Sequence, residues 1–321
     1  MAWKKQGVIF EPAGQAGWMN SHAQVPTPLV TDSAVRVYFC TRPEPGISLT
    51  TFLDLDPATL ERVAYLHEEP IVPLGKPGTF DEFGVMPSCV LEHEGRVLIY
   101  TTGWTRGVTV PYLNGVGLLI SEDGGKTFER YSDGPLLRTT PHEPYSAMSP
   151  YVLRQGDRWH MWYSSGTDWV EVDGKYEPIY LIKYASSDDG LNWVQNDRLC
   201  IPPQTPGEAN TRPTVHVADG VYHMWFCYRG SEGFRGGVGS YRIGYAHSTD
   251  GIDWVRDDQR AGIEPSPDGW DSVMVAYPQV VETSRGLTMF YNGNGFGTSG
   301  IGYALWQDDE GLGPCASRAG R

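Results

Sequence analysis

Short apolar and aromatic runs, separated by polar residues, glycines and prolines, recur along the whole chain. Five segments share one order: a proline, a short strand-like run, a polar turn, and a second run rich in aromatic residues. These segments cover residues 27–40, 86–100, 149–163, 212–226 and 277–291. Short runs of this kind bounded by turn residues are typical of β-strands, so the pattern predicts five similar strand pairs.

The prolines that open these segments are regularly spaced. They are Pro28, Pro87, Pro150, Pro213 and Pro278, with successive separations of 59, 63, 63 and 65 residues. Proline suits the first residue of a strand, where no N–H is needed for sheet pairing. A period this long and this regular predicts one structural unit repeated five times.

Each unit continues into a third strand, predicted at residues 47–52, 115–120, 180–185, 241–246 and 300–305. In the three middle units this strand runs into a Ser-x-Asp-Gly turn that ends on an aromatic residue, at 121–128, 187–193 and 248–254. These turns resemble the Asp-box turns of sialidases and related propellers. Their aspartates can accept hydrogen bonds from the turn's own amides, so we expect them to be structural. A fourth strand is predicted to start at the aromatic residue.

The fifth unit has no fourth strand after Leu305, but residues 3–12 supply a strand at the start of the chain. The sequence therefore predicts an all-β fold, a five-bladed β-propeller in which the N-terminal strand closes the last blade. We expect one domain over residues 1–321, with strand 3–12 completing blade five. The tail, about 307–321, is expected to be loosely held.

The amino-acid composition limits which kinds of partner the protein is expected to bind. The net charge is −14, from 25 Lys+Arg against 39 Asp+Glu, and such a negative field disfavours nucleic acid and anionic membranes as partners. The N-terminus lacks the apolar core of a signal peptide, and the five cysteines are scattered without a CxxC pair, which favours a cytoplasmic location. No metal-binding motif or cofactor motif appears, so we expect neither, and the oligomeric state is left open.

In a propeller, two sets of loops lie on one face: those leading into the innermost strands and those joining strands two and three. Four of the five leading loops carry a carboxylate five to seven residues before the repeat's proline, namely Asp81, Glu143, Glu208 and Asp271. Surface loops of an acidic chain are often acidic, but recurrence at one position is what a central acidic funnel would require. These four residues are therefore the predicted catalytic groups.

Other side chains on the same face suit a carbohydrate. Amides, carboxylates and arginines bind sugar hydroxyls, and aromatic rings pack on sugar C–H faces. The predicted partner is a small carbohydrate or glycoside. The predicted substrate-binding residues are His22, Gln24, Arg42, Trp104, Asp168, Trp169, Arg212, Arg229, Tyr277 and Asn292.

The blade count, the blade pattern and the proline strand starts resemble the five-bladed glycosidase superfamily. It comprises the arabinanase/xylosidase-like and invertase-like glycoside hydrolases and the mannoside phosphorylases. The resemblance implies a glycoside hydrolase, or a closely related enzyme, that acts by carboxylate acid/base catalysis. In arabinanase-like members an Asp of blade one is the base, an Asp of blade three tunes the pKa, and a Glu of blade four is the acid. By blade, Glu208 matches the acid and Glu143 the tuning position.

Blade one has no carboxylate at the matching place, so the roles stay open. Either Glu208 or Asp81 would donate the proton, and either Asp271 or Glu143 would act as base or nucleophile. One alternative is a glycoside phosphorylase in which Arg212 and Arg229, with Arg42, bind phosphate beside a single carboxylic acid. A sialidase is a weaker alternative because sialidases have six blades. Another is a non-catalytic glycan-binding propeller.

Overall fold

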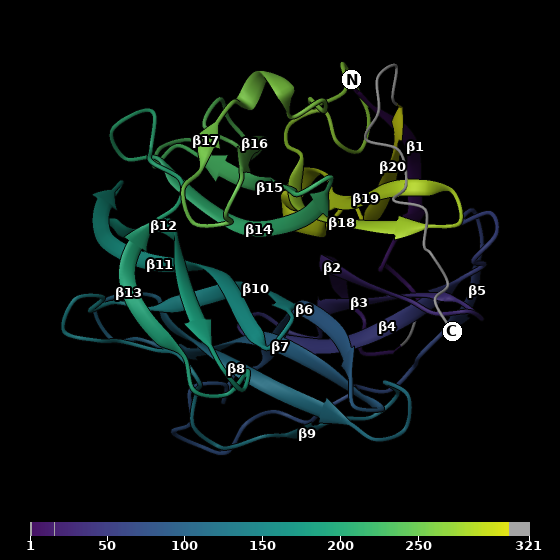
Figure 1. The fold of residues 1–321 in the computed structure, drawn as a ribbon, viewed down its shortest axis with the longest axis horizontal. Helices are drawn as coiled ribbons and strands as arrows, with labels where there is room; N and C mark the ends of the chain where they lie inside the picture. Colours follow the sequence, from purple (N-terminus) through teal and green to yellow (C-terminus); the bar gives the residue numbers. More distant parts are fainter. Residues whose placement is uncertain (1, 16, 308–321) are drawn as a thin grey trace.

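Five four-stranded antiparallel sheets form a ring in the computed structural model, which describes residues 2–15 and 17–307 (Figure 1). The prediction of an all-β, five-bladed propeller is confirmed. Each sheet follows the predicted order, in which successive strands of one unit are neighbours. Antiparallel hairpins with short turns explain why each blade occupies one continuous stretch of sequence, blade five excepted.

Within each blade the strands follow one another from the ring centre outwards. Blade one has β2 (Ser21–Val30), β3 (Val35–Arg42), β4 (Leu49–Leu55) and β5 (Val63–Leu66). Blade two has β6 (Val85–His93), β7 (Arg96–Arg106), β8 (Tyr112–Ser121) and β9 (Glu129–Arg130). Blade three has β10 (Ala147–Gln155), β11 (Arg158–Val172), β12 (Lys175–Ser187) and β13 (Val194–Leu199). Blade four has β14 (Ala209–Ala218), β15 (Val221–Arg229), β16 (Arg242–Ser248) and β17 (Val255–Arg256). Blade five has β18 (Ala276–Thr283), β19 (Gly286–Asn292), β20 (Ile301–Gln307) and β1 (Ala2–Phe10).

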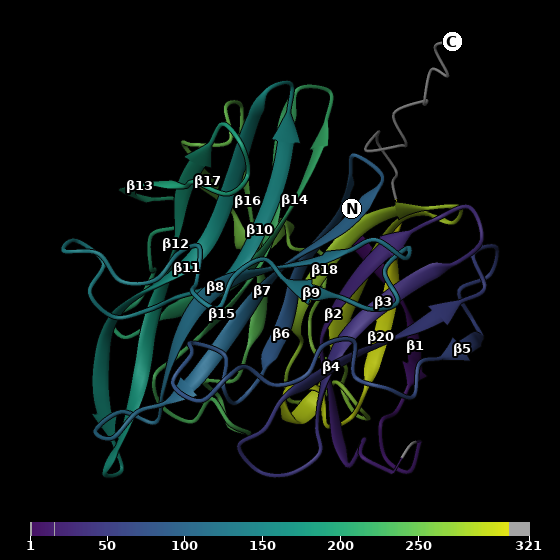
Figure 2. The same ribbon diagram turned by 90° about the horizontal axis from the view of Figure 1, so that it is seen from below.

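The innermost strands β2, β6, β10, β14 and β18 surround the centre of the ring (Figure 1). Each contacts the innermost strand of the next blade, and β18 contacts β2 to complete the circle. Seen from the side, the long strands β11 and β12 form an extended hairpin (Figure 2). This hairpin is important because two residues of β12, Glu177 and Tyr180, line the pocket at the centre of the ring.

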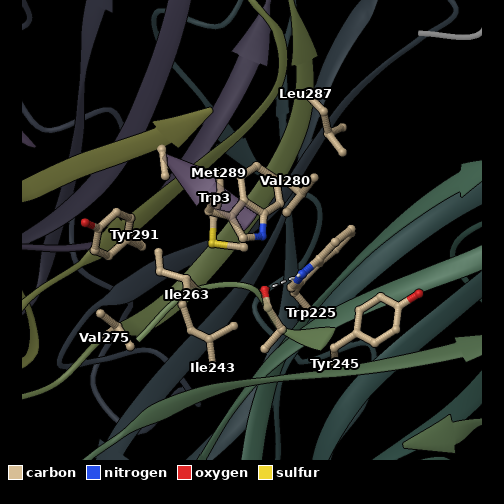
Figure 3. Packing of buried hydrophobic residues seen from close by; sticks show 12 residues of the cluster. Trp3, Trp225, Ile243, Tyr245, Ile263, Val275, Val280, Leu287, Met289 and Tyr291 are labelled. Carbon is tan, nitrogen blue, oxygen red and sulfur yellow. Dashed lines mark hydrogen bonds between the residues drawn. The ribbon is translucent and has the colours of Figure 1, made fainter. Parts of the chain in front are cut away.

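The N-terminal strand β1 closes the ring as predicted. It pairs antiparallel with β20, with Trp3 opposite Trp306 and Lys5 opposite Ala304. The Trp3 indole is 5% exposed and packs between blades four and five, against Trp225, Val280 and Met289 (Figure 3). The apolar faces of blades four and five meet there, so β1 is held in the last blade by core packing as well as by its pairing with β20.

The three Asp-box turns hold neighbouring blades together. Asp189 accepts hydrogen bonds from the amides of Leu191 and Asn192, and these amides keep the pKa of its carboxyl below the ordinary range. The glycine carbonyl of each turn accepts a bond from an aromatic side chain of the preceding blade. These bonds are Tyr38–Gly125 at 2.7 Å, Tyr100–Gly190 at 2.9 Å and Trp162–Gly251 at 2.8 Å. The Asp boxes thus have a structural role: the aspartate binds the amides of its own turn, and the glycine carbonyl binds the preceding blade.

Replacing Tyr100 by Phe should remove one of these contacts between blades. The change removes the hydrogen bond from the Tyr100 hydroxyl and leaves the Gly190 carbonyl with Trp193 Nε1, at 3.1 Å, as its donor, so a loss of about 1 kcal/mol of unfolding free energy is expected. Urea unfolding followed by far-UV circular dichroism measures it. Tyr131→Phe, at a phenol on an exposed side chain, is the control. Equal stability of the two variants would contradict a stabilising role for this contact.

Two 3₁₀ helices, η1 (Asp258–Arg260) and η2 (Asn294–Gly297), accompany the strands. Within the described ranges no helix is long and apolar enough to cross a membrane. Cys40, Cys89, Cys200 and Cys227 are buried free thiols. The predicted loose tail falls, apart from Gln307, outside the described residues.

Candidate functional site: the axial pocket

A cavity of about 440 Å³ lies where the five blades meet, and we call it the axial pocket. Every blade contributes side chains to its lining, so the pocket exists only in the closed ring. The lining residues are Gln24, Val25, Arg42, Gly46, Ile47, Ser48, Met86, Thr102, Trp104, Tyr112, Asn114, Met148, Ser149, Glu177, Tyr180, Thr211, Arg229, Phe234, Arg235, Tyr241, Tyr277 and Phe296.

Irregular backbone in the innermost strands supplies part of this lining. Four residues that precede a proline in an innermost strand have φ between 51° and 57°: Val25 before Pro26, Ser149 before Pro150, Arg212 before Pro213 and Tyr277 before Pro278. The register of each of these strands shifts at the same place. Positive φ is costly for residues other than glycine, about 1–3 kcal/mol each, and such strain is often found at functional sites. Of the four, all but Arg212 line the axial pocket.

Two arginines reach the pocket from equivalent positions. Arg42 ends β3 in blade one, and Arg229 ends β15 in blade four. Arg42 donates a hydrogen bond to Gln24 Oε1 at 3.0 Å. Arg229 is 2% exposed and donates to the Tyr180 hydroxyl at 3.1 Å and to the carbonyls of Pro178 and Gly230 at 2.8 Å. All these acceptors are neutral groups.

Glu177 is the carboxylate of the axial pocket, and among the described residues it is the one Asp or Glu in the lining. It lies on β12, in the long hairpin of blade three, and is 7% exposed. Both of its oxygens accept hydrogen bonds from Arg235 Nη2, at 2.7 and 2.8 Å. Arg235 belongs to the loop between β15 and β16 of blade four, so this ion pair joins two blades over the pocket.

Arg212 lies beside the lining rather than in it. Its guanidinium is 1% exposed and donates to the carbonyls of Val25 and Pro87 and to Thr27 Oγ1. One side chain of blade four is therefore bonded to blades one and two. Burial lowers the pKa of Arg212 from 12.5 to about 10, which keeps the side chain charged at neutral pH.

The four predicted catalytic carboxylates belong to four different blades. Each is 1–5% exposed and binds partners inside its own blade. The contacts are Asp81 to Arg130 Nε at 2.6 Å, Glu143 to Tyr163 Oη at 2.8 Å and Lys183 Nζ at 3.9 Å, Glu208 to Arg256 Nη1 at 2.5 Å, and Asp271 to Lys5 Nζ at 2.7 Å and Tyr291 Oη at 2.9 Å. The lining of the axial pocket, as far as the chain is described, includes none of them. A catalytic role for these four stays a prediction, and none of these contacts supports it.

The predicted acidic funnel needs a correction. Three arginines and one glutamate line the axial pocket, so its charged lining is mainly basic. The recurring carboxylates have a different explanation: in three blades the partner is a cation on the outermost strand, and in blade three it is a lysine of the third strand. Because the blade is repeated, an ion pair inside the blade is repeated with it. In the sequence, carboxylates that recur for this reason look the same as carboxylates that share one site.

Half of the predicted substrate-binding residues line the pocket: Gln24, Arg42, Trp104, Arg229 and Tyr277. The other five do not. Asn292 bonds the backbone of Ala23, Val25 and Gly300, and His22 bonds Ser21 and Thr298. Asp168 accepts a hydrogen bond from the amide of Trp169, and the Trp169 ring packs edge-on against Tyr112. Arg212 lies behind the lining, bonded to backbone carbonyls.

The sequence prediction missed Glu177, Arg235, Tyr180 and Tyr241. The last two had been predicted only as starts of third strands. One pattern was available for others: Met86 and Ser149, directly before the repeat's Pro87 and Pro150, line the pocket. Nothing local marks Glu177, because its partner Arg235 is 58 residues away in the chain. Over the described ranges, no group of three or more His, Cys, Asp or Glu residues is arranged to hold a metal ion.

Solved structures with a similar fold include glycoside hydrolases. One glycoside hydrolase superposes with a TM-score of 0.72 at 16% identity, covering 94% of this chain and 90% of its own. A thermostable family-43 glycoside hydrolase gives 0.61 at 14% identity, covering 94% of each chain. An endo-arabinase from Bacteroides thetaiotaomicron gives 0.61 at 14% identity, covering 95% of this chain and 99% of its own. At these identities the similarity establishes the fold.

Sequence comparison identifies two relatives in Mycobacterium tuberculosis, the uncharacterized proteins MT1551 and Rv1502. Each is 38% identical over 312 residues, which is 96% of this chain and 100% of the relative. No family model matches the chain. The protein is therefore a member of the same family as MT1551 and Rv1502, and its five-bladed propeller fold is similar to that of the three glycoside hydrolase structures above.

Proposed function

We propose that this protein is a carbohydrate-active enzyme that acts on a small glycoside bound in the axial pocket. One observation carries the proposal. The pocket combines aromatic rings, amide and hydroxyl groups and a single carboxylate, contributed by all five blades. Aromatic rings pack on the C–H faces of sugars, and the polar groups bind their hydroxyls.

Unpartnered polar atoms in the lining support a ligand rich in hydroxyl groups. Trp104 Nε1 and Asn114 Oδ1 are buried and have no hydrogen-bond partner in the described structure. One is a donor and the other an acceptor, and Asn114 is only 4% exposed. Because a sugar hydroxyl both donates and accepts, a bound sugar can satisfy both atoms.

Glu177 is the residue proposed to transfer a proton during turnover. Arg235 fixes the position of its carboxylate with two hydrogen bonds. The usual glycosidase mechanism uses two carboxyl groups about 5–9.5 Å apart, and the axial pocket contributes one. The proposed chemistry therefore relies on Glu177 alone among carboxylates. The four leading-loop carboxylates have no part in it.

Turnover of aryl glycosides by the purified protein, measured with and without inorganic phosphate, tests this proposal. Glu177→Gln should lower kcat by about 10²–10⁴-fold, the usual contribution of a positioned acid or base. The fold should persist, because Arg235 is 63% exposed and its charge stays hydrated when the carboxylate is lost.

Glu171→Gln is the matched control, an exposed glutamate on the same hairpin. Equal turnover by Glu177→Gln and the control would contradict the assigned role. Binding of sugars without turnover by the unaltered protein would favour the glycan-binding alternative. Turnover that requires phosphate would favour the phosphorylase. The phosphorylase predicted from the sequence used Arg212, which does not line the axial pocket.

A further inference from the structure

Two of the three arginines that line the axial pocket lack counter-charges. Arg42 and Arg229 bond to neutral acceptors, and neither forms an ion pair in the part of the chain that the structure describes. Glu177 is the lining's carboxylate, and Arg235 already binds it through both oxygens. Two guanidinium charges therefore face the pocket without an anionic partner, and Arg212 adds a third just behind the lining.

The other titratable groups around the pocket supply no negative charge. Burial raises the pKa of Tyr112, Tyr241 and Tyr277, so these phenols are protonated at neutral pH. Burial, and then the charge of Arg42, lower the pKa of His22 to about 4, which leaves the imidazole neutral. Burial also raises the pKa of the Cys227 thiol, close to Arg212, to about 12. The pocket is thus positive in a protein whose net charge is −14.

A cation without an anionic partner is expensive to bury, and Arg229 is 2% exposed. Its guanidinium lies over the Phe234 ring, 3.9 Å from the centroid, a contact that stabilises the charge but does not neutralise it. Its three hydrogen bonds engage three of five N–H groups, and Arg42 uses one bond to Gln24, so both can bond further acceptors. Guanidinium groups match the paired oxygens of carboxylates and phosphates. The missing partner therefore has the chemistry of a small oxyanion.

We propose that the axial pocket binds a sugar that carries an anionic group, a carboxylate or a phosphate ester, and that Arg42 and Arg229 bind this group. The proposal rests on the function proposed above and specifies its substrate class. The aromatic and amide side chains hold the sugar, and the two arginines select the charged form over its neutral counterpart.

Calorimetric titration of the purified protein with matched sugar pairs tests the proposal. The pairs are methyl glucuronide with methyl glucoside, and glucose 1-phosphate with glucose, and they separate the two sources of the anion. An anionic probe should bind at least about tenfold more tightly than its neutral partner, because hydrogen bonds to charged groups are the stronger kind. Raising the salt concentration should weaken binding of the anionic probe.

Arg42→Met should weaken binding of the anionic probe at least about tenfold. Arg42→Lys, which keeps the charge, should weaken it less. Arg62→Met, at an exposed arginine outside the lining, is the control and should bind like the unaltered protein. Thermal unfolding midpoints establish that each variant is folded. At position 229 the variant to test is Arg229→Lys, not a Met variant, because Arg229 is buried.

The outcomes separate this proposal from the proposed function. Neutral and anionic sugars that bind within threefold of each other would overturn the charge selection and leave the sugar pocket standing. Inorganic phosphate that binds as tightly as glucose 1-phosphate would overturn it too, because the anion would not be part of the sugar. Failure of every sugar in the panel to bind would count against the proposed function itself.

Discussion

Deletion of residues 2–10 should prevent the protein from reaching its stable folded state. The deletion removes β1, the strand that completes blade five and pairs with β20. It also removes the Trp3 indole from the core between blades four and five, and the Lys5 partner of the buried Asp271. An open sheet edge and a buried carboxylate without its cation would remain, and both are strongly unfavourable.

A single substitution measures the same closure in a protein that still folds. Trp3→Ala should lower the unfolding free energy by about 3–5 kcal/mol, the usual range for deleting a large buried aromatic side chain. Urea unfolding followed by tryptophan fluorescence and circular dichroism gives the value. Lys4→Ala is exposed on the same strand and should change stability by no more than about 0.5 kcal/mol. If Trp3→Ala cost no more than Lys4→Ala, closure of the ring by β1 would not contribute to stability.

The second large effect is expected at Asp81. Its carboxylate is 1% exposed and accepts hydrogen bonds from Arg130 Nε at 2.6 Å and Thr79 Oγ1 at 2.9 Å. Asp81→Asn keeps the shape but removes the charge that compensates Arg130. Breaking a buried ion pair in this way costs about 3–5 kcal/mol, so a large fall in unfolding free energy is expected.

Asp188→Asn is the matched control, because it breaks an exposed Asp–Arg pair with Arg158 at 3.1 Å. Surface pairs contribute about 0–1 kcal/mol, so this variant should be nearly as stable as the unaltered protein. Turnover per folded molecule should be unchanged in Asp81→Asn. A variant with normal stability and no turnover would instead favour the catalytic role that the sequence predicts for Asp81.

Three of the predicted catalytic carboxylates have a structural explanation in the repeated blade. Asp81, Glu208 and Asp271 recur at one position of the blade, as residues of a shared site would. In the structure each binds a cation on the outermost strand of its own blade. The recurrence reflects the repeated blade, in which a loop must be tied to the outer strand. Glu177 has no counterpart in the repeat pattern, and it reaches the axial pocket because the hairpin of blade three is extended.

The sequence by itself determined the fold. The proline period, the alternating short runs and the strand supplied by the N-terminus follow from local rules of turns and strand pairing, and closure of the ring follows from counting strands. The same local rules do not predict which polar side chains line the axial pocket and which are buried behind it. Arg212 and Arg229 both come from blade four, yet one is bonded to backbone carbonyls behind the lining and the other lines the pocket. That difference depends on contacts between blades far apart in sequence, which form only when the ring is closed.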